Sequence, residues 1–547
     1  MKIGRKALIY LALMASTLAA QTPTFSGVVN PASDLPPGVP NYGIAQGSVF
    51  IVYGTNLTGG NSLVQAALPL PNSLNATAIT ISQNNSGTIL PVPILYASPG
   101  QLAAVMPSNA PLGSVTMTVN NNGKVGSTQV LVVASAFGIS TADGSGNGVG
   151  AVTFGDYSYV TTSKSAKPGD TLILWGTGLG ALPSGADDAH GAPFGNIPAA
   201  IHLSVGGVDA QVTYAGRAPG AVGLDQINFV VPQNAPLGCT VSIIVQTTAP
   251  VLTTSNGPTT AIATSNGVCT DPVQNLPQSL IPTFTSQNAT KVLVVQGQQS
   301  TNYSFPPGGG APVPGTQASA GVFFLSFSPS QVTSQISKFN NTSSINSCRT
   351  GVIKGATSET PPIATGLDAG SAITLTPASG GALSLPSVGT GFYSASANSL
   401  KGGTYTLSTT GASGVGPLSV VFPIPQPVTW TNATQLMTGG QIDRSQPLVI
   451  NWTGVDPNAY VQIVGQAQLG PLNSPTYTIY FDCAAPANTG TFSVPPAVLS
   501  NMPPGTTAFA SINVSTNTIP LSIGSVSGFD LALDLTQYKT SIPVVFK

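Results

Sequence analysis

One pattern occurs twice in the first half of this chain and constrains its fold more than any other feature. Residues 47–59 read GSVFIVYGTNLTG, and residues 167–180 read KPGDTLILWGTGLG. In both, a glycine and a polar residue precede an apolar run that ends in Gly-Thr-x-Leu. The five residues NAPLG then follow at 109–113 and again at 234–238. Both motifs are offset by nearly the same length of chain, which predicts two tandem copies of one domain.

The composition favours short strands joined by tight turns. Charged residues make up only 6% of the 547 residues, so long charged helix faces cannot be built, whereas 41% hydrophobic residues argue against a disordered chain. The 62 glycines and 48 prolines are scattered among Ser, Thr, Val and Ile. We therefore predict an all-β protein of tandem immunoglobulin-like β-sandwich domains. The formal net charge of −1, without a basic run, argues against nucleic acid as a partner.

The chain divides at changes in composition. Lys2, Arg5 and Lys6 precede an apolar segment and a small-residue cleavage site, which predicts a secretory signal at 1–20. The expected parts that follow are sandwich copy one (21–134), copy two (135–270), a linker (271–282), a third sandwich (283–420), a Pro-rich linker (421–427) and a C-terminal sandwich (428–547). After the signal we expect no membrane span, and therefore a secreted protein in the periplasm, on the outer surface or outside the cell.

Longer motifs carry a family resemblance. They are SGVVNPAS at 26–33, ILYASPGQLAAVMPSNAPLG at 94–113 and VTYAGRAPGAVGLDQINFVVPQNAPLG at 212–238. The chain resembles the secreted acidobacterial (Solibacter-type) repeat proteins, and its two copies resemble IPT/TIG-like immunoglobulin-fold domains. The resemblance covers nearly the whole mature chain. It implies the fold and export, and it implies no activity.

Two loops contain the residue types of metal or catalytic sites. Asp187, Asp188 and His190 could bind a metal or form a base with its orienting carboxylate, and His202 would have to converge with them. Residues 143–148 space oxygen ligands like the opening of a calcium loop, but the twelfth position of that loop is not acidic. We interpret the first as a solvated loop and the second as a glycine-rich turn between two domains. We predict no catalytic residue, no metal and no cofactor.

Several aromatic residues could form a surface on which a sugar stacks. Each lies beside apolar neighbours at a period of two, and this pattern favours core filling instead. The residues concerned are Tyr53, Tyr96, Trp175, Tyr214, Trp430 and Trp452.

The four cysteines predict one disulfide. Export places them in an oxidising compartment, where thiols within reach form disulfides. Cys239 begins a predicted strand, and Cys269 follows the strand expected to return beside it, so we predict a Cys239–Cys269 disulfide. A buried thiol at Cys239 is the alternative. Cys348 and Cys483 fall in different expected domains, and their pairing stays open.

These observations favour a modular protein that is not an enzyme. We expect a structural, surface-display or adhesion role. The alternative is a carbohydrate-binding protein of the cell envelope or the extracellular space, with a cell-surface glycan or protein as its partner.

Overall fold

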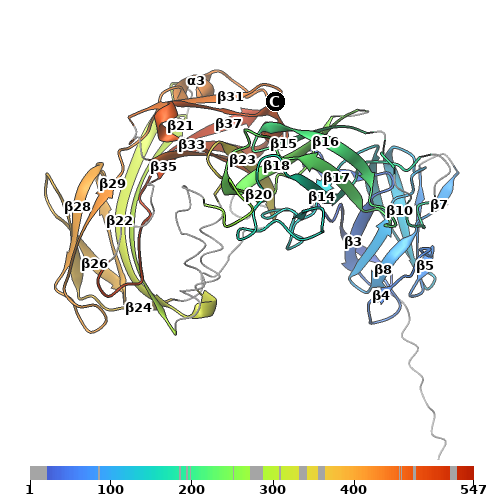
Figure 1. Ribbon diagram of the computed structural model, residues 1–547, viewed down its shortest axis with the longest axis horizontal. Helices are drawn as coiled ribbons and strands as arrows, with labels where there is room; N and C mark the ends of the chain where they lie inside the picture. The colour runs from blue at the N-terminus through green and yellow to red at the C-terminus, as the bar shows by residue number, and fades with distance from the viewer. Residues whose placement is uncertain are drawn as a thin grey trace, which may run out of the picture.

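The computed structural model describes most of the chain beyond its first 20 residues. The described residues are 21–547 without 84–86, 184–186, 193–194, 198, 250–251, 271–287, 307–309, 332–341, 355–363, 455, 457–458, 472–475 and 518–525. The expected signal (1–20) and first linker (271–282) lie outside them. The β-rich units follow one another along an arch, with the N-terminal unit at one end and the strands around β26 and β28 at the other (Figure 1).

The first unit is a sandwich of two sheets, ordered β1-β3-β9-β8-β4 and β2-β11-β10-β6-β5, with β7 paired to β6. Its strands are β1 (Thr24–Val29), β2 (Ile44–Ala45), β3 (Val49–Thr55), β4 (Val64–Gln65), β5 (Ser73–Leu74), β6 (Thr77–Ser82), β7 (Ile89–Pro91), β8 (Ile94–Ser98), β9 (Gln101–Val105), β10 (Gly113–Asn121) and β11 (Lys124–Val133). Strand β2 runs parallel to β11, and the other pairs are antiparallel. This is the strand order of an immunoglobulin sandwich, with β3, β9 and β8 in one sheet and β6, β10 and β11 in the other.

The second unit repeats this pairing. Its strands are β12 (Gly138–Ile139), β13 (Val152–Thr153), β14 (Thr171–Thr177), β15 (Ala200–Val205), β16 (Val208–Arg217), β17 (Asp225–Val230), β18 (Gly238–Ala249), β19 (Thr253–Thr254) and β20 (Thr259–Ile262). Strands β14, β17 and β16 pair as β3, β9 and β8 do, and β15, β18 and β20 pair as β6, β10 and β11 do. The two GTxL motifs therefore lie in equivalent strands, β3 and β14. The Cys239–Cys269 disulfide is present and joins the start of β18 to the segment after β20.

The C-terminal half is built around one sheet of fourteen strands. The strands and helices of this half are β21 (Thr290–Ser304), β22 (Val313–Phe327), β23 (Ser347–Lys354), β24 (Thr365–Gly366), β25 (Ala372–Pro377), β26 (Leu383–Gly389), β27 (Phe392–Ala397), β28 (Gly403–Thr409), β29 (Leu418–Ile424), β30 (Thr429–Trp430), α3 (Ala433–Thr438), β31 (Leu448–Thr453), β32 (Tyr460–Leu469), β33 (Tyr477–Pro486), η2 (Ala487–Thr489), β34 (Thr491–Val494), α4 (Pro496–Leu499), β35 (Gly505–Asn517), β36 (Leu531–Asp534) and β37 (Gln537–Phe546). Of these strands, β30, β31 and β34 form a separate three-stranded sheet. The long β21–β22 hairpin runs along the arch (Figure 1), and β21 also pairs in parallel with β36 and β37.

The sheet does not break at the expected Pro-rich linker, 421–427. Residues Val421–Ile424 belong to β29 and pair with β28. Pro423 is tolerated there because β29 is the last strand of the sheet path, where a missing N–H costs no ladder hydrogen bond. Strand β23, expected in the third sandwich, pairs with β33 of the C-terminal one. Cys348 lies directly opposite Cys483 in that pair, and the two form the second disulfide.

The second unit covers the free edge of this sheet. Strand β23 stands at the end of the sheet path. On its edge, the Thr350 carbonyl accepts a hydrogen bond from Gly257 N, and Val352 bonds through both backbone groups to the Asn147 side chain. Thr240 and Ser242, on β18, bond to Ser344, which precedes β23, and to Ser347, its first residue. An open sheet edge is a template for association with other chains, so this cover both joins the halves and protects the edge.

Candidate functional site

The loop that contains Asp187, Asp188 and His190 helps to hold the first two units together. Asp188 accepts hydrogen bonds from both the backbone N–H and the hydroxyl of Ser108, each at 2.6 Å. Asp187 lies on the surface and contacts His190, with 2.8 Å between Oδ2 and Nδ1. The N–H of Ala189 and then the His190 ring lower the pKa of Asp187. Asp188 is therefore engaged in the joint, and only one carboxylate of the loop faces the histidine.

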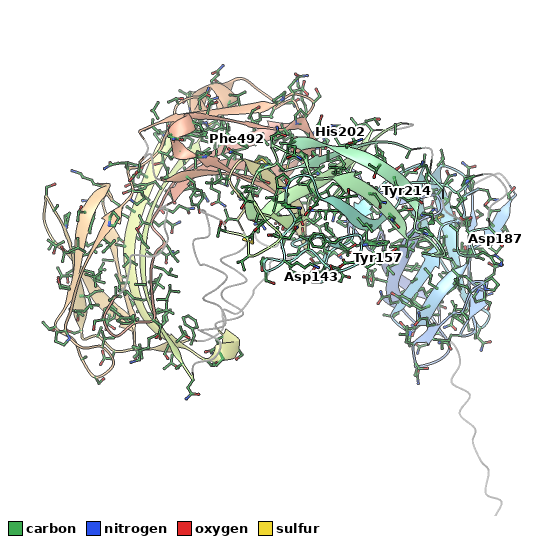
Figure 2. The ribbon with its side chains drawn as sticks, in the orientation of Figure 1. Asp143, Tyr157, Asp187, His202, Tyr214 and Phe492 are labelled. Atoms are coloured by element: carbon green, nitrogen blue, oxygen red, sulfur yellow. A yellow bond between two sulfur atoms is a disulfide. The ribbon has the colours of Figure 1, made fainter. Side chains whose placement is uncertain are left out.

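His202 does not converge with this loop. Its Nε2 lies 2.8 Å from Asp209 Oδ1 across the β15–β16 hairpin, and both side chains are exposed. Figure 2 shows His202 and Asp187 on separate parts of the arch. Within the described ranges, no group of three or more His, Cys, Asp or Glu side chains is arranged to hold a metal ion.

In the turn at residues 143–148, which is spaced like the opening of a calcium loop, the Asp143 carboxylate bonds to groups of the same segment. The Asp143 Oδ1 atom accepts hydrogen bonds from the Thr141 hydroxyl and from the N–H and hydroxyl of Ser145. Partial burial raises the pKa of Asp143, but the hydrogen bonds from Ser145 and Thr141 outweigh it, so the pKa lies below its usual value. Asn147 faces the β23 edge. The candidate ligand oxygens of Asp143 and Asn147 thus bond within the turn and to the edge of β23.

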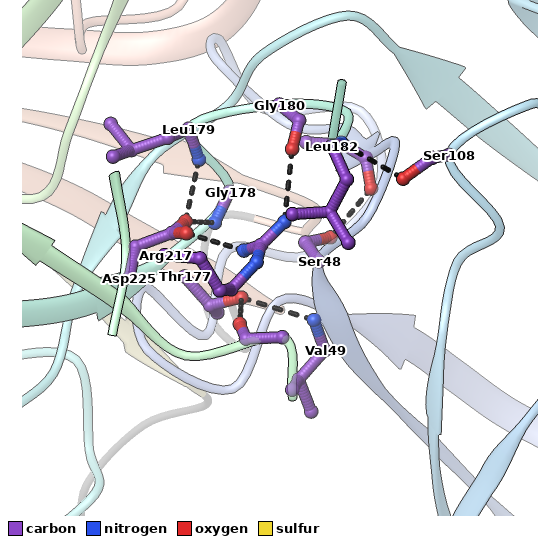
Figure 3. A network of polar contacts seen from close by, with 12 residues as sticks. Ser48, Val49, Ser108, Thr177, Gly178, Leu179, Gly180, Leu182, Arg217 and Asp225 are labelled. Carbon is purple, nitrogen blue, oxygen red and sulfur yellow. Dashed lines mark hydrogen bonds and ion pairs between the residues drawn. The ribbon is translucent and has the colours of Figure 1, made fainter. Parts of the chain in front are cut away.

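A buried ion pair that we did not predict lies where the first two units meet (Figure 3). Arg217 bonds through Nη1 to Asp225, and both side chains are almost fully buried. Asp225 also accepts the N–H groups of Gly178 and Leu179 at 2.7 and 2.8 Å. Burial raises the pKa of Asp225 to about 6, although Arg217 and the two N–H groups act in the opposite direction. The pair thus fixes the turn after β14.

The same turn touches copy one. The Thr177 hydroxyl donates to the Gly223 carbonyl at 2.6 Å and accepts from Val49 N at 3.0 Å. A comparison of the two copies in the sequence could have pointed to Asp225. Asp225 stands opposite Gly176 on β14, whereas copy one has Gly100 beside Gly54. The two copies therefore differ at the position that forms the joint.

The aromatic residues divide into two groups. Tyr214, Trp430 and Trp452 are 5%, 6% and 2% exposed, which confirms the core reading for them. Tyr53 and Tyr96 are partly buried and pack against a small buried cluster around Ile51, so the core interpretation holds for them in part. It is wrong for Trp175, which is partly exposed on an outer sheet face. The reason is the alternation of a strand, because Leu172 and Leu174 point inward and Trp175 therefore points outward.

Trp175 forms a partly exposed aromatic pair with Tyr157. Its indole Nε1 donates to the Thr153 hydroxyl at 3.0 Å, which fixes the ring. The ring of Tyr157, a residue that is 66% exposed, lies 6.1 Å from it between centroids, at an interplanar angle of 35°. Gln226 stands directly opposite Trp175 on β17 and donates to Asn228 at 2.8 Å. Gln226 itself is buried, so the accessible groups on this outer face of the second unit are the rings of Tyr157 and Trp175 and the Asn228 amide, near the position of Tyr157 in Figure 2.

No family model and no curated protein match this chain. Solved structures that are similar include the SGBP-B of a Bacteroides ovatus mixed-linkage glucan utilization locus, at 10% identity over 86% of this chain and 98% of that one, with a TM-score of 0.14. Another is SGBP-B from a complex xyloglucan utilization locus in Bacteroides uniformis, at 11% identity over 73% and 97%, with a TM-score of 0.19. Titin domains A168–A170 match at 9% identity over 73% and 96%, with a TM-score of 0.13. These scores are too low to carry any argument about arrangement or ligand.

Helices in the described part of the chain are all too short or too polar to cross a membrane.

Proposed function

We propose that this protein is an exported, modular, non-catalytic protein with a structural, surface-display or adhesion role. The observation that carries the proposal is the cover of the β23 edge by the second unit. Gly257 and Asn147 bond to the backbone of β23, and Thr240 and Ser242 bond to serine side chains at its start. Units joined by backbone and buried polar contacts keep a fixed separation, which is what a protein that presents a surface away from a cell requires.

The disulfides support export. Cys239–Cys269 and Cys348–Cys483 account for all four cysteines of the chain. Structural disulfides persist in the periplasm and outside the cell and are rare in a reducing cytosol. A secretory leader at 1–20 fits the same compartment.

The polar groups also support a non-catalytic role. Asp188, Asp225 and Asp143 each bond to backbone groups of a turn or joint. A catalytic base has to reach a substrate proton, and these side chains are held by the protein itself.

Antibody labelling of intact cells tests the proposal. Antibodies raised against the purified protein should label intact cells of the producing bacterium or detect the protein in the medium, and protease added to intact cells should remove any label. A cytoplasmic antigen that is detected only after lysis would contradict a surface role. The matched control is a periplasmic marker protein, which should remain protected.

The second candidate function is carbohydrate binding at the envelope. The cluster of Trp175, Tyr157 and Asn228 favours it, because accessible aromatic rings beside an amide are suited to sugars.

A further inference from the structure

We infer that the outer face formed by Tyr157, Trp175 and Asn228 is a binding site for a neutral polysaccharide. The inference deepens the second candidate function and rests on it. Trp175 supplies a ring whose orientation is fixed by its hydrogen bond to Thr153. A side chain that is already fixed loses little conformational entropy when a ligand stacks on it.

Tyr157 is held in an unfavourable backbone conformation that keeps its ring beside Trp175. Its φ is 63°, in the left-handed region that bulky residues rarely occupy. The turn is closed by Tyr157 N, which donates to the Phe154 carbonyl at 3.0 Å, and by Asp156, which accepts from the N–H and hydroxyl of Ser158. Such strain is found at binding sites because the surrounding contacts must maintain it.

The Asn228 amide supplies the hydrogen-bonding part of the site. Gln226, directly opposite Trp175, is buried and donates to Asn228 Oδ1 at 2.8 Å, so it holds the Asn228 amide in place. The diagonal neighbour Asn228 is partly exposed, and cross-strand diagonal positions are about 7–8 Å apart. An amide both donates and accepts hydrogen bonds, as a sugar hydroxyl does.

The charges near the site favour a neutral ligand. Lys164 is the nearby cation, and its Nζ lies 3.8 Å from Asp156 and 2.6 Å from the Ser158 hydroxyl. The same ammonium lies 4.8 Å from the centre of the Phe154 ring. Lys164 and Asp156 thus offset one another, so this pair adds no net charge that would select a charged polymer. A pyranose ring matches the remaining chemistry, since its C–H face packs on an aromatic face and its hydroxyls bond to amides.

Copy one does not offer this arrangement. Tyr53 occupies the position of Trp175, because it stands opposite Gln101 as Trp175 stands opposite Gln226. The Lys354 ammonium lies over the Tyr53 ring, 5.9 Å from its centre. The cation from the C-terminal half therefore occupies the face on which a sugar would stack. The site is specific to the second unit.

Tryptophan fluorescence gives a direct test. The chain has three tryptophans, and Trp430 and Trp452 are buried, so Trp175 reports on ligands at the surface. The full mature protein is titrated with hexasaccharides of neutral β-glucan, xylan, mannan and α-glucan. We expect a saturable change in emission with at least one of them. The Tyr157→Ala variant should bind that sugar at least about tenfold more weakly, the loss of roughly one stacked ring.

Two variants control for other causes. Tyr157→Phe keeps the ring and should retain binding, and Phe305→Ala removes an aromatic residue that is 50% exposed in the C-terminal half and should change nothing. Equal binding by wild type and Tyr157→Ala would overturn the inference, as would the lack of a saturable signal with every sugar. Capture of a protein through the same rings, without sugar binding, would also overturn it. These failures leave the surface-labelling result for the primary proposal unaffected.

Discussion

The Asn147 side-chain amide bonds twice to Val352, donating to its carbonyl at 2.9 Å and accepting from its N–H at 3.1 Å. One side chain thereby acts as a neighbouring strand for the edge of β23. Asn147→Ala should leave both backbone groups without this partner and lower the free energy of unfolding by about 1–3 kcal/mol. Hydrogen exchange at the Val352 amide should accelerate in the variant.

The control for this change is Asn61→Ala, since Asn61 is exposed in the first unit. It should leave both stability and exchange at Val352 unchanged. Unchanged exchange in Asn147→Ala would show that the second unit does not cover the β23 edge in solution.

The Cys348–Cys483 disulfide should stabilise the C-terminal half. It closes a loop with a sequence separation of 135, and the chain-entropy estimate for a loop of this size is about 4–5 kcal/mol. Cys348→Ala with Cys483→Ala should therefore lower the melting temperature more than Cys239→Ala with Cys269→Ala, whose separation is 30. A non-reduced peptide map of exported protein should contain both linked peptides. Alkylation of these cysteines as free thiols would contradict the pairing.

Asp534 should make stability depend on pH in a defined direction. Burial raises its pKa from 3.8 to about 6, although hydrogen bonds from Thr536 act in the opposite direction. The folded state therefore holds the proton more tightly than the unfolded state. The contribution of Asp534 is most favourable below pH 4 and is lost as the pH rises through 6.

Asp534→Asn removes this loss. The free energy of unfolding of the variant minus that of wild type should be higher at pH 7.5 than at pH 4, by up to about 3 kcal/mol. Denaturant titration of both proteins at both pH values measures this difference. Asp225 is present in both proteins, so its contribution to the pH dependence cancels in the difference. Asp443→Asn is the control of opposite sign, because hydrogen bonds from Ser445 lower the pKa of Asp443. An unchanged difference between wild type and Asp534→Asn at the two pH values would exclude the buried-carboxylate explanation.

What could be predicted from the sequence was local or repeated. The GTxL motifs occur twice, and the equivalence of β3 and β14 followed from comparing them. The joints could not be predicted in this way. Pro423 looks like a linker residue in the sequence, and its place in β29 depends on which strand ends the sheet. Cys348 meets Cys483 only because β23 pairs with a strand that follows far along the chain.

The candidate site shows the same limit. The sequence identified Trp175 as aromatic at a period of two but did not indicate which face of β14 it occupies. That choice follows from packing, since Leu172 and Leu174 are fully buried. Tyr157 carries no sequence signal for its left-handed backbone, because tyrosine is among the residues least expected there. Its proximity to Trp175 becomes visible only when the turn is folded.

The Arg217–Asp225 pair gives the last prediction. Arg217→Met removes the cation and leaves a fully buried carboxylate with only the N–H groups of Gly178 and Leu179, so it should destabilise the protein by about 3–5 kcal/mol. In the described structure Arg217 Nε has no hydrogen-bond partner, so desolvation of the guanidinium is only partly offset. Arg217→Met combined with Asp225→Leu should therefore be more stable than Arg217→Met alone. A double-mutant cycle by denaturant titration measures the coupling. Additive effects of the two substitutions would contradict the role of the pair in the joint.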